Sequence, residues 1–88
     1  MKIIEFGKKG CQPCQNVSEF LTKNNVEYTF INPFETEDPD ELELILENNI
    51  KTIPVTILVD ENGTVVSRKA GYNEKALNHL IELYKESK

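Results

Sequence analysis

The sequence lacks the features that mark membrane, exported and nucleic-acid-binding proteins. No apolar run approaches the roughly 20 residues that a membrane-spanning helix requires. Residues 1–10 contain neither the apolar core nor the small-residue cleavage site of a signal peptide. The formal net charge of −5 argues against nucleic acid as the main partner. We therefore expect a cytoplasmic protein that binds neither membrane nor nucleic acid.

Cysteine and histidine are also scarce, with only Cys11, Cys14 and His79 in the chain. A secreted domain stapled by disulfides would normally carry more cysteines, and a disulfide that closes so short a loop adds little stability. A zinc site needs about four ligands, and His79 is expected on the surface of the last helix. Two cysteines with this spacing therefore predict redox chemistry and no metal. Inert buried cysteines are the alternative.

The apolar residues recur at spacings typical of alternating strands and helices, and the chain is long enough for one domain, 1–88. Strands are predicted at Lys2–Phe6, Val26–Ile31, Val55–Val59 and Thr64–Lys69, and helices from Cys11, from Pro39 and around Leu77–Tyr84. The two helical crossovers imply some parallel pairing, whereas the short turn before the last strand forces an antiparallel edge. The order β-α-β-α-β-β-α predicts an α/β domain: a mixed four-stranded sheet with helices on both faces.

Three finer features follow from side-chain spacing. Leu42, Ile45 and Leu46 are expected to form the buried stripe of the second helix. The Asn62–Gly63 pair favours a type I′ turn between the last two strands. The acidic segment Glu35–Glu47 is interpreted as a solvated surface, with a docking site for a basic partner as the alternative. With no spare apolar face, the chain is expected to be a monomer.

The two cysteines are predicted to differ in chemistry. Cys11 lies at the start of a helix, where unpaired N–H groups and the positive end of the dipole favour a thiolate. Lys8 and Lys9 are expected to lower its pKa further below the ~8.5 of a free cysteine. Cys14 belongs to the apolar stripe of the helix and should be buried, and Pro13 presets the backbone of the first turn. Cys11 is therefore the expected attacking thiolate and Cys14 the resolving thiol.

Over essentially its whole length the sequence resembles the thioredoxin superfamily. In size it is similar to short thioredoxin-like and glutaredoxin-like proteins of bacteria and phages. The resemblance is carried by Cys11-Gln12-Pro13-Cys14 opening the first helix, by Thr52-Ile53-Pro54-Val55 opening the third strand, and by Gly71 after the hairpin. It implies the thioredoxin fold and an enzyme that needs no cofactor and reduces disulfide-containing protein substrates. A thioredoxin reductase-like protein or glutathione is the implied electron donor. The substrate-binding residues it implies are Gln12, Pro13, Ile53, Pro54 and Gly71, with Pro54 in the cis form.

Glu5 is the third candidate catalytic residue. It precedes Cys11 by six residues, where thioredoxins place a buried carboxylate that moves protons for the second cysteine. A buried glutamate would have the raised pKa that suits acid–base catalysis. Because the side chains of a strand alternate between its faces, the alternative is that Glu5 faces water.

The sequence also departs from the family pattern. Gly10 stands where thioredoxins usually carry tryptophan, the chain contains no tryptophan, and the second strand has no lysine to pair with Glu5. Glutaredoxins carry tyrosine where Pro13 stands, and their glutathione-holding Gly-Gly element is replaced by Gly71-Tyr72. These differences favour a thioredoxin-like protein-disulfide reductase. A glutathione-dependent glutaredoxin that supplies ribonucleotide reductase and a non-catalytic thioredoxin-like binding subunit are the alternatives.

Overall fold

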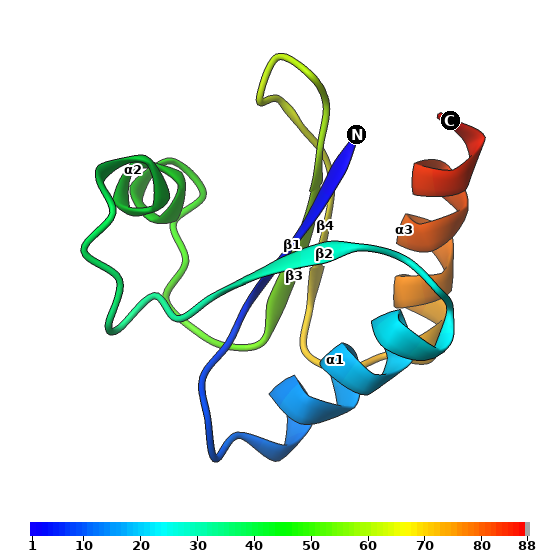
Figure 1. Ribbon diagram of the computed structural model, residues 1–88, viewed down its shortest axis with the longest axis horizontal. Coiled ribbons are helices and arrows are strands. Elements are labelled where there is room, and N and C mark those ends of the chain that lie inside the picture. The colour runs from blue at the N-terminus through cyan, green and yellow to red at the C-terminus, as the bar shows by residue number, and fades with distance from the viewer. Residues whose placement is uncertain (88) are drawn as a thin grey trace.

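The computed structural model describes residues 1–87 and has the predicted order of elements (Figure 1). The elements are β1 (Lys2–Phe6), α1 (Gln12–Lys23), β2 (Tyr28–Ile31), α2 (Pro39–Glu47), β3 (Val55–Val59), β4 (Val65–Ala70) and α3 (Glu74–Glu86). The second strand begins two residues later than predicted. The fourth strand is shifted by one residue toward the C-terminus. Every other strand boundary agrees with the prediction.

The sheet is mixed, as predicted, with strand order β2-β1-β3-β4. β1 pairs in parallel with β2 and antiparallel with β3, and β3 pairs antiparallel with β4. β1 and β3 therefore lie in the centre of the sheet. Val55 to Val59 is buried at every position, as expected of a strand covered on both faces.

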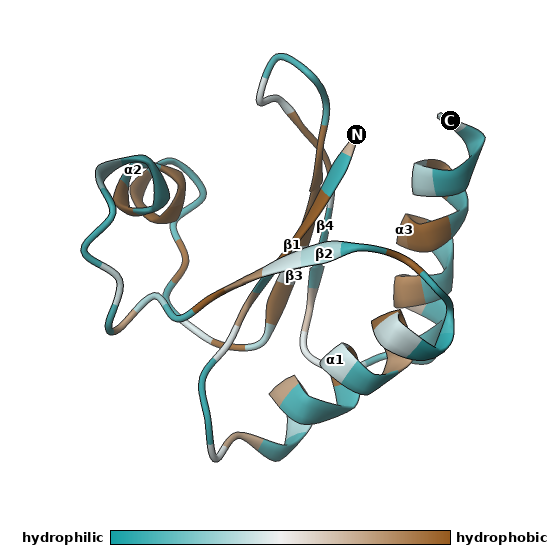
Figure 2. Cartoon of the chain, viewed as in Figure 1, coloured by the Kyte–Doolittle hydropathy of each residue, from teal (hydrophilic) through white to brown (hydrophobic). Residues whose placement is uncertain are grey.

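Helices cover both faces of the sheet, with α1 and α3 on one side and α2 on the other (Figure 1). Because the side chains of a strand alternate, Ile3 and Leu58 face α1 and α3, whereas Ile4 and Ile57 face α2. Apolar residues are concentrated along the strands and on the side of α3 that faces them (Figure 2). The architecture is therefore the predicted α/β sandwich of three layers.

The predicted buried stripe of α2 is wrong at Leu42 and Leu46 and right at Ile45. Leu42 is 40% exposed and Leu46 is 80% exposed, whereas Leu44 and Ile45 pack against the core. The helix ends in a Schellman motif, in which the Ile50 N–H donates to the Ile45 carbonyl at 3.0 Å. This motif brings both Ile50 and Ile45 against the core. The helix is therefore rotated about its axis relative to the predicted orientation, and Leu46 points toward solvent.

The turn between β3 and β4 also differs from the prediction. A type I′ turn requires positive φ at two successive residues, but of Asn62 and Gly63 only Gly63 has it, at 81°. The Asp60 side chain instead accepts from the backbone N–H groups of Asn62 and Thr64, both at 2.9 Å. The pairing shifts between Leu58 and Val59, so that one residue of β4 has no partner on β3, as in a bulged hairpin.

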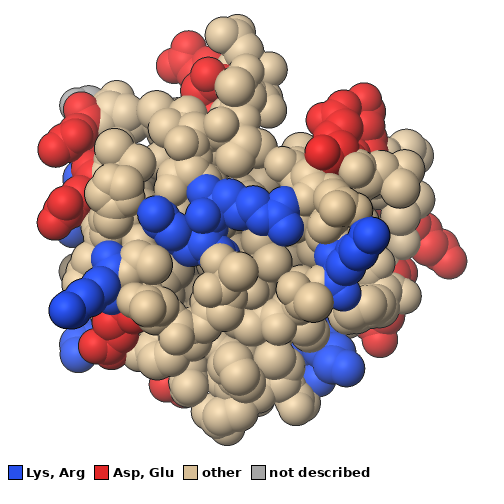
Figure 3. Space-filling view, turned by 180° about the vertical axis from the view of Figure 1, so that it is seen from behind, with Lys and Arg blue, Asp and Glu red and all other residues tan. Residues whose placement is uncertain are grey.

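Charged side chains are unevenly distributed. Figure 3 views the molecule from behind and shows Lys and Arg near the middle of that face, with Asp and Glu toward its margins.

On the edge strand β4, Arg68 donates to the Asn48 carbonyl, and the Lys69 ammonium lies 3.2 Å from His79 Nδ1. Charged side chains on an edge strand discourage pairing with another sheet. His79 is exposed, as expected.

Candidate active site

The two cysteines lie at the N-terminus of α1 and form a disulfide, with their Cα atoms 5.2 Å apart. Cys11 is the N-cap residue, and the Cys14 N–H donates to its sulfur at 3.3 Å. Cys14 lies one turn along on the buried face with Val17 and is 1% exposed, whereas Cys11 is half-buried. The predicted burial of Cys14 is confirmed. The Cys11 sulfur therefore lies at the positive end of the α1 dipole and accepts a hydrogen bond from the first turn.

Gly7 makes the burial of Cys14 possible. A Cβ atom at Gly7 would lie 3.2 Å from the Cys14 sulfur and 3.0 Å from Cε2 of Phe30. The backbone of Gly7 is fixed to β2 by a 2.9 Å hydrogen bond from its N–H to the Ile31 carbonyl. The β1–α1 loop therefore passes directly against the buried cysteine, and Gly7 was not among the predicted site residues.

Three loops meet at the end of the sheet that carries the disulfide. Phe6 pairs with Val55, and Val55 pairs with Ala70. The last residue of β1, the first of β3 and the last of β4 therefore lie at the same end of the sheet. The Ile53–Pro54 peptide bond is cis and Pro54 is buried. The Gly71 N–H donates to the Pro54 carbonyl at 2.8 Å. The fold therefore brings the substrate-binding residues implied by the resemblance to one end of the molecule.

Gln12 and Pro13 lie between the two cysteines and are both exposed. The Gln12 amide donates to Asn16 Oδ1 at 3.0 Å across one turn of α1. Both residues therefore lie on the surface, directly after Cys11 in the chain.

Glu5 is fully buried on the face of β1 that is covered by α1, so the alternative that it faces water is wrong. The Ser18 hydroxyl donates to Glu5 Oε1 at 2.6 Å. Burial raises the pKa of Glu5 from 4.5 to about 7, and the hydrogen bond from Ser18 acts in the opposite direction. Within residues 1–87, neither Glu5 Oε2 nor the buried hydroxyl of its cross-strand neighbour Thr56 has a hydrogen-bond partner.

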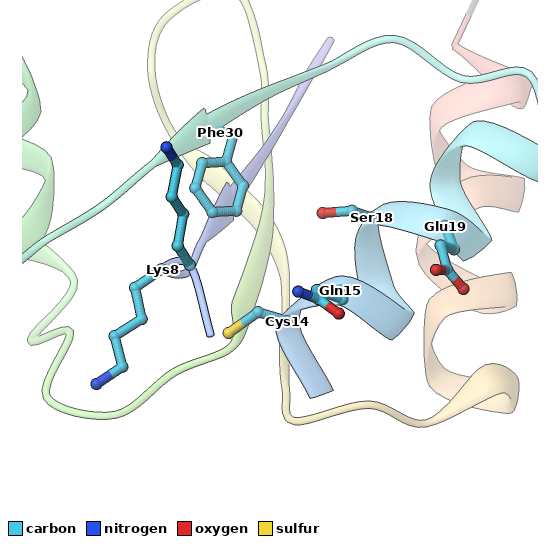
Figure 4. A pocket seen from close by; sticks show the side chains of 7 residues that line it. Lys8, Cys14, Gln15, Ser18, Glu19 and Phe30 are labelled. Atoms are coloured by element: carbon cyan, nitrogen blue, oxygen red, sulfur yellow. The ribbon is translucent and has the colours of Figure 1, made fainter. Parts of the chain in front are cut away.

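A pocket of about 260 Å³ opens beside the disulfide. Cys14 and Ser18 line it from α1, Phe30 lines it from β2, and Lys8 lies at its rim (Figure 4). Sequence inspection missed Ser18 and Phe30. The four-residue spacing from Cys14 to Ser18 would have placed both on one face of the helix. Phe30 is opposite Glu5 only because of the strand register, which no local pattern reveals.

Neither a metal-binding group nor a membrane-spanning helix is found among the described residues. No group of three or more His, Cys, Asp or Glu side chains in residues 1–87 is placed to hold a metal ion. Within the same residues, no helix is both long enough and apolar enough to cross a membrane.

Comparison with known proteins gives the same picture as the geometry. The sequence model of the family described as Glutaredoxin matches residues 3–63. The SPbeta prophage-derived thioredoxin-like protein YosR of Bacillus subtilis is 31% identical over 83 residues, which cover 93% of this chain and 96% of that protein. Thioredoxin 1 of Plasmodium falciparum is 35% identical over 83 residues, covering 93% of this chain and 78% of that protein.

Solved structures of the same fold include oxidised thioredoxin from Plasmodium falciparum, with a TM-score of 0.70 and 25% identity over 93% of this chain and 78% of that one. The glutaredoxin-like NrdH-redoxin of Escherichia coli has a TM-score of 0.67 and 19% identity over 91% of this chain and 95% of that one. The sequence match, the cysteine pair at a helix start and the sheet topology agree. The chain belongs to the glutaredoxin family, has the thioredoxin fold and is a thiol–disulfide oxidoreductase.

Proposed function

We propose that this oxidoreductase reduces disulfide bonds in other proteins, with Cys11 as the attacking thiolate and Cys14 as the resolving thiol. The observation that carries the proposal is the position of the two sulfurs. One caps the helix and accepts the Cys14 N–H, and the other is buried one turn along within bonding distance of the first. A substrate disulfide reaches the first sulfur, whereas the second belongs to a cysteine that is 1% exposed in the wall of the pocket.

The reaction proceeds by two thiol–disulfide exchanges. The Cys11 thiolate attacks one sulfur of the substrate disulfide, whose other sulfur leaves as a thiolate and takes up a proton. The Cys14 thiol then gives its proton to a base, and its thiolate attacks the Cys11 sulfur of the mixed disulfide. The second substrate thiolate leaves and is protonated, and the Cys11–Cys14 disulfide remains. The electron donor returns two electrons and two protons to restore the dithiol.

Glu5 is the proposed base for Cys14. A pKa of about 7 keeps a substantial fraction of this carboxyl ionised at neutral pH and equally able to release the proton afterwards. Ser18, one turn after Cys14 on the same helix, hydrogen-bonds Glu5 and also lines the pocket. Since Glu5 itself has no exposed surface, its protons exchange with solvent through the Ser18 hydroxyl, which lines the pocket.

A thioredoxin reductase-like protein is the proposed electron donor. Pro13 occupies the motif position where glutaredoxins carry tyrosine, and Gly71-Tyr72 replaces the Gly-Gly element. The curated relatives are described as thioredoxin-like and as a thioredoxin. The NrdH-redoxin of Escherichia coli, a glutaredoxin-like protein with a thioredoxin-like activity profile, has the same fold. A dithiol that must stay reduced suits a reducing compartment, and we place the protein in the cytoplasm.

Cysteine variants test the assignment of roles. Cys14→Ser should accumulate a covalent mixed disulfide with its substrate, because no resolving thiol remains. Cys11→Ser should neither trap substrates nor reduce insulin, and the double variant is the matched control. Normal insulin reduction by Cys11→Ser would overturn the proposal.

The electron donor is identified by supplying NADPH with thioredoxin reductase in one assay, and NADPH with glutathione and glutathione reductase in a second. If the protein reduced its substrate only in the assay with glutathione and glutathione reductase, glutathione would be the donor.

A further inference from the structure

A second hollow adjoins the pocket beside the disulfide. The first pocket, of about 260 Å³, contains Cys14 in its wall, and the second has a volume of about 500 Å³. They share Lys8, Lys9 and Phe30 and therefore form one groove that leads away from the buried cysteine. We call it the β2-side groove and define its outer part by Lys8, Lys9, Phe30, Asn32, Phe34 and Glu35. None of the substrate-binding residues implied by the resemblance lines this groove.

Two aromatic rings are exposed in this groove. Phe30 is 44% exposed and Phe34 is 63% exposed, although most large apolar side chains of the chain are buried. The loop that carries Phe34 is held in place, because the Phe34 N–H donates to Asn32 Oδ1 at 2.9 Å. The Lys8 ammonium lies 5.7 Å from the centre of the Phe34 ring, within the range of a cation–π contact. The groove therefore offers a fixed apolar surface next to positive charge.

The groove contains charged side chains of both signs. Lys8 and Lys9, both exposed, line both hollows, and Glu19 lines the hollow beside the disulfide. Glu35 lies in the outer part and begins the acidic segment Glu35–Glu47. Two lysines against one glutamate leave the hollow that contains Cys14 with a positive balance, in a protein with a net charge of −5. Such a layout attracts a carboxylate near the disulfide and disfavours a basic residue there.

We propose that the β2-side groove binds the segment of a substrate protein that flanks its reactive cysteine, and that it selects segments with an acidic residue beside that cysteine and an aromatic residue further along. The carboxylate pairs with Lys8 and Lys9, and the aromatic side chain packs on Phe30 and Phe34. The inference rests on the proposed function, because it names the class of protein disulfide that is reduced.

The test compares three peptides that share one disulfide and one aromatic residue and carry acidic, neutral or basic residues beside the cysteine. The value of kcat/KM for each peptide is divided by its rate constant with dithiothreitol, which corrects for the reactivity of the peptide itself. At low salt the acidic peptide should be reduced about tenfold faster than the basic one, and the difference should shrink at high salt. Replacing its aromatic residue by alanine should lower the rate about threefold.

Variants of the groove supply the controls. The double variant Lys8→Glu and Lys9→Glu should reverse the order of the peptides, and Phe34→Ala should remove the preference for an aromatic residue. Lys75→Glu, an exposed lysine on α3, is the matched control and should leave the order unchanged. A small neutral disulfide reports any change in the reactivity of Cys11 itself.

Equal corrected rates for the acidic and basic peptides with the wild-type protein would overturn the groove proposal alone. The same holds if the lysine double variant slowed all peptides and the small disulfide by one common factor. Failure to reduce any of the three peptides would instead overturn the proposed function.

Discussion

The Glu5→Gln substitution tests whether the buried carboxyl has the pKa assigned to it. Glutamine has nearly the same size and can still accept the hydrogen bond from Ser18, but it does not ionise. In the oxidised protein neither cysteine titrates, so the variant differs from the wild type in a single titratable group. Any pH-dependent difference between the two proteins therefore reports Glu5.

The expected size and sign follow from the folded and unfolded pKa values. Burial raises the pKa of Glu5 from 4.5 to about 7, so the folded protein binds more protons than the unfolded chain between these values. The free energy of unfolding of the wild type should fall as pH rises through this window and stay level above it. Since one pH unit is worth about 1.4 kcal/mol per proton, the total loss is about 3 kcal/mol. Glu5→Gln does not suffer this loss.

Urea unfolding of both oxidised proteins at pH 4, 5.5, 7 and 8.5, followed by far-UV circular dichroism, measures the effect. The stability of Glu5→Gln relative to the wild type should rise by about 3 kcal/mol from the lowest to the highest pH. Glu19→Gln, at an exposed position of α1, is the matched control, because its side chain stays in water in both states. A stability difference for Glu5→Gln that does not change with pH would refute the reasoning.

Three further substitutions test other parts of the structure. Ser18→Ala removes the donor that stabilises the ionised form of Glu5, so the pKa of Glu5 should rise and the rising limb of the pH–rate profile should move up by about one pH unit; an unchanged profile would contradict the proton route. Gly7→Ala forces a Cβ atom against the buried sulfur and the aromatic ring beside it, and urea unfolding should show a loss of about 1–3 kcal/mol. Leu46→Ala should change stability by no more than about 0.5 kcal/mol, whereas Leu77→Ala in the core should cost about 2–5 kcal/mol. Similar losses at both leucines would contradict the observed rotation of α2.

The order of the elements and the sheet type were predictable because they depend on apolar spacing and on turn residues. The end of α1 is an example. The Asn24-Asn25 pair ends this helix in a Schellman motif, in which Asn25 has a φ of 58° and the Val26 N–H donates to the Leu21 carbonyl at 3.3 Å. The same motif at the end of α2 was not anticipated, and its apolar contact determines which side of that short helix faces the sheet.

The cysteine pair was also predictable, since its spacing places both sulfurs at one helix start. The surroundings of Glu5 were not. Alternation along a strand separates two faces, but it cannot show that both are covered, and β1 is buried from Ile3 to Phe6. The contacts of Glu5 with Ser18 and of Gly7 with Phe30 join residues far apart in the chain. They depend on how α1 and β2 are placed on β1, which the local sequence does not encode.

The different accessibility of the two cysteines has a consequence for how the protein survives oxidants. Peroxide reaches the half-buried sulfur first and converts it to a sulfenic acid, which a neighbouring thiol can capture before it is oxidised further. The shielded thiol is close enough to do so, because the same two residues already form a disulfide. The product is the Cys11–Cys14 disulfide, which is the ordinary oxidised state of the protein. The oxidation is therefore reversed when the electron donor next reduces this disulfide.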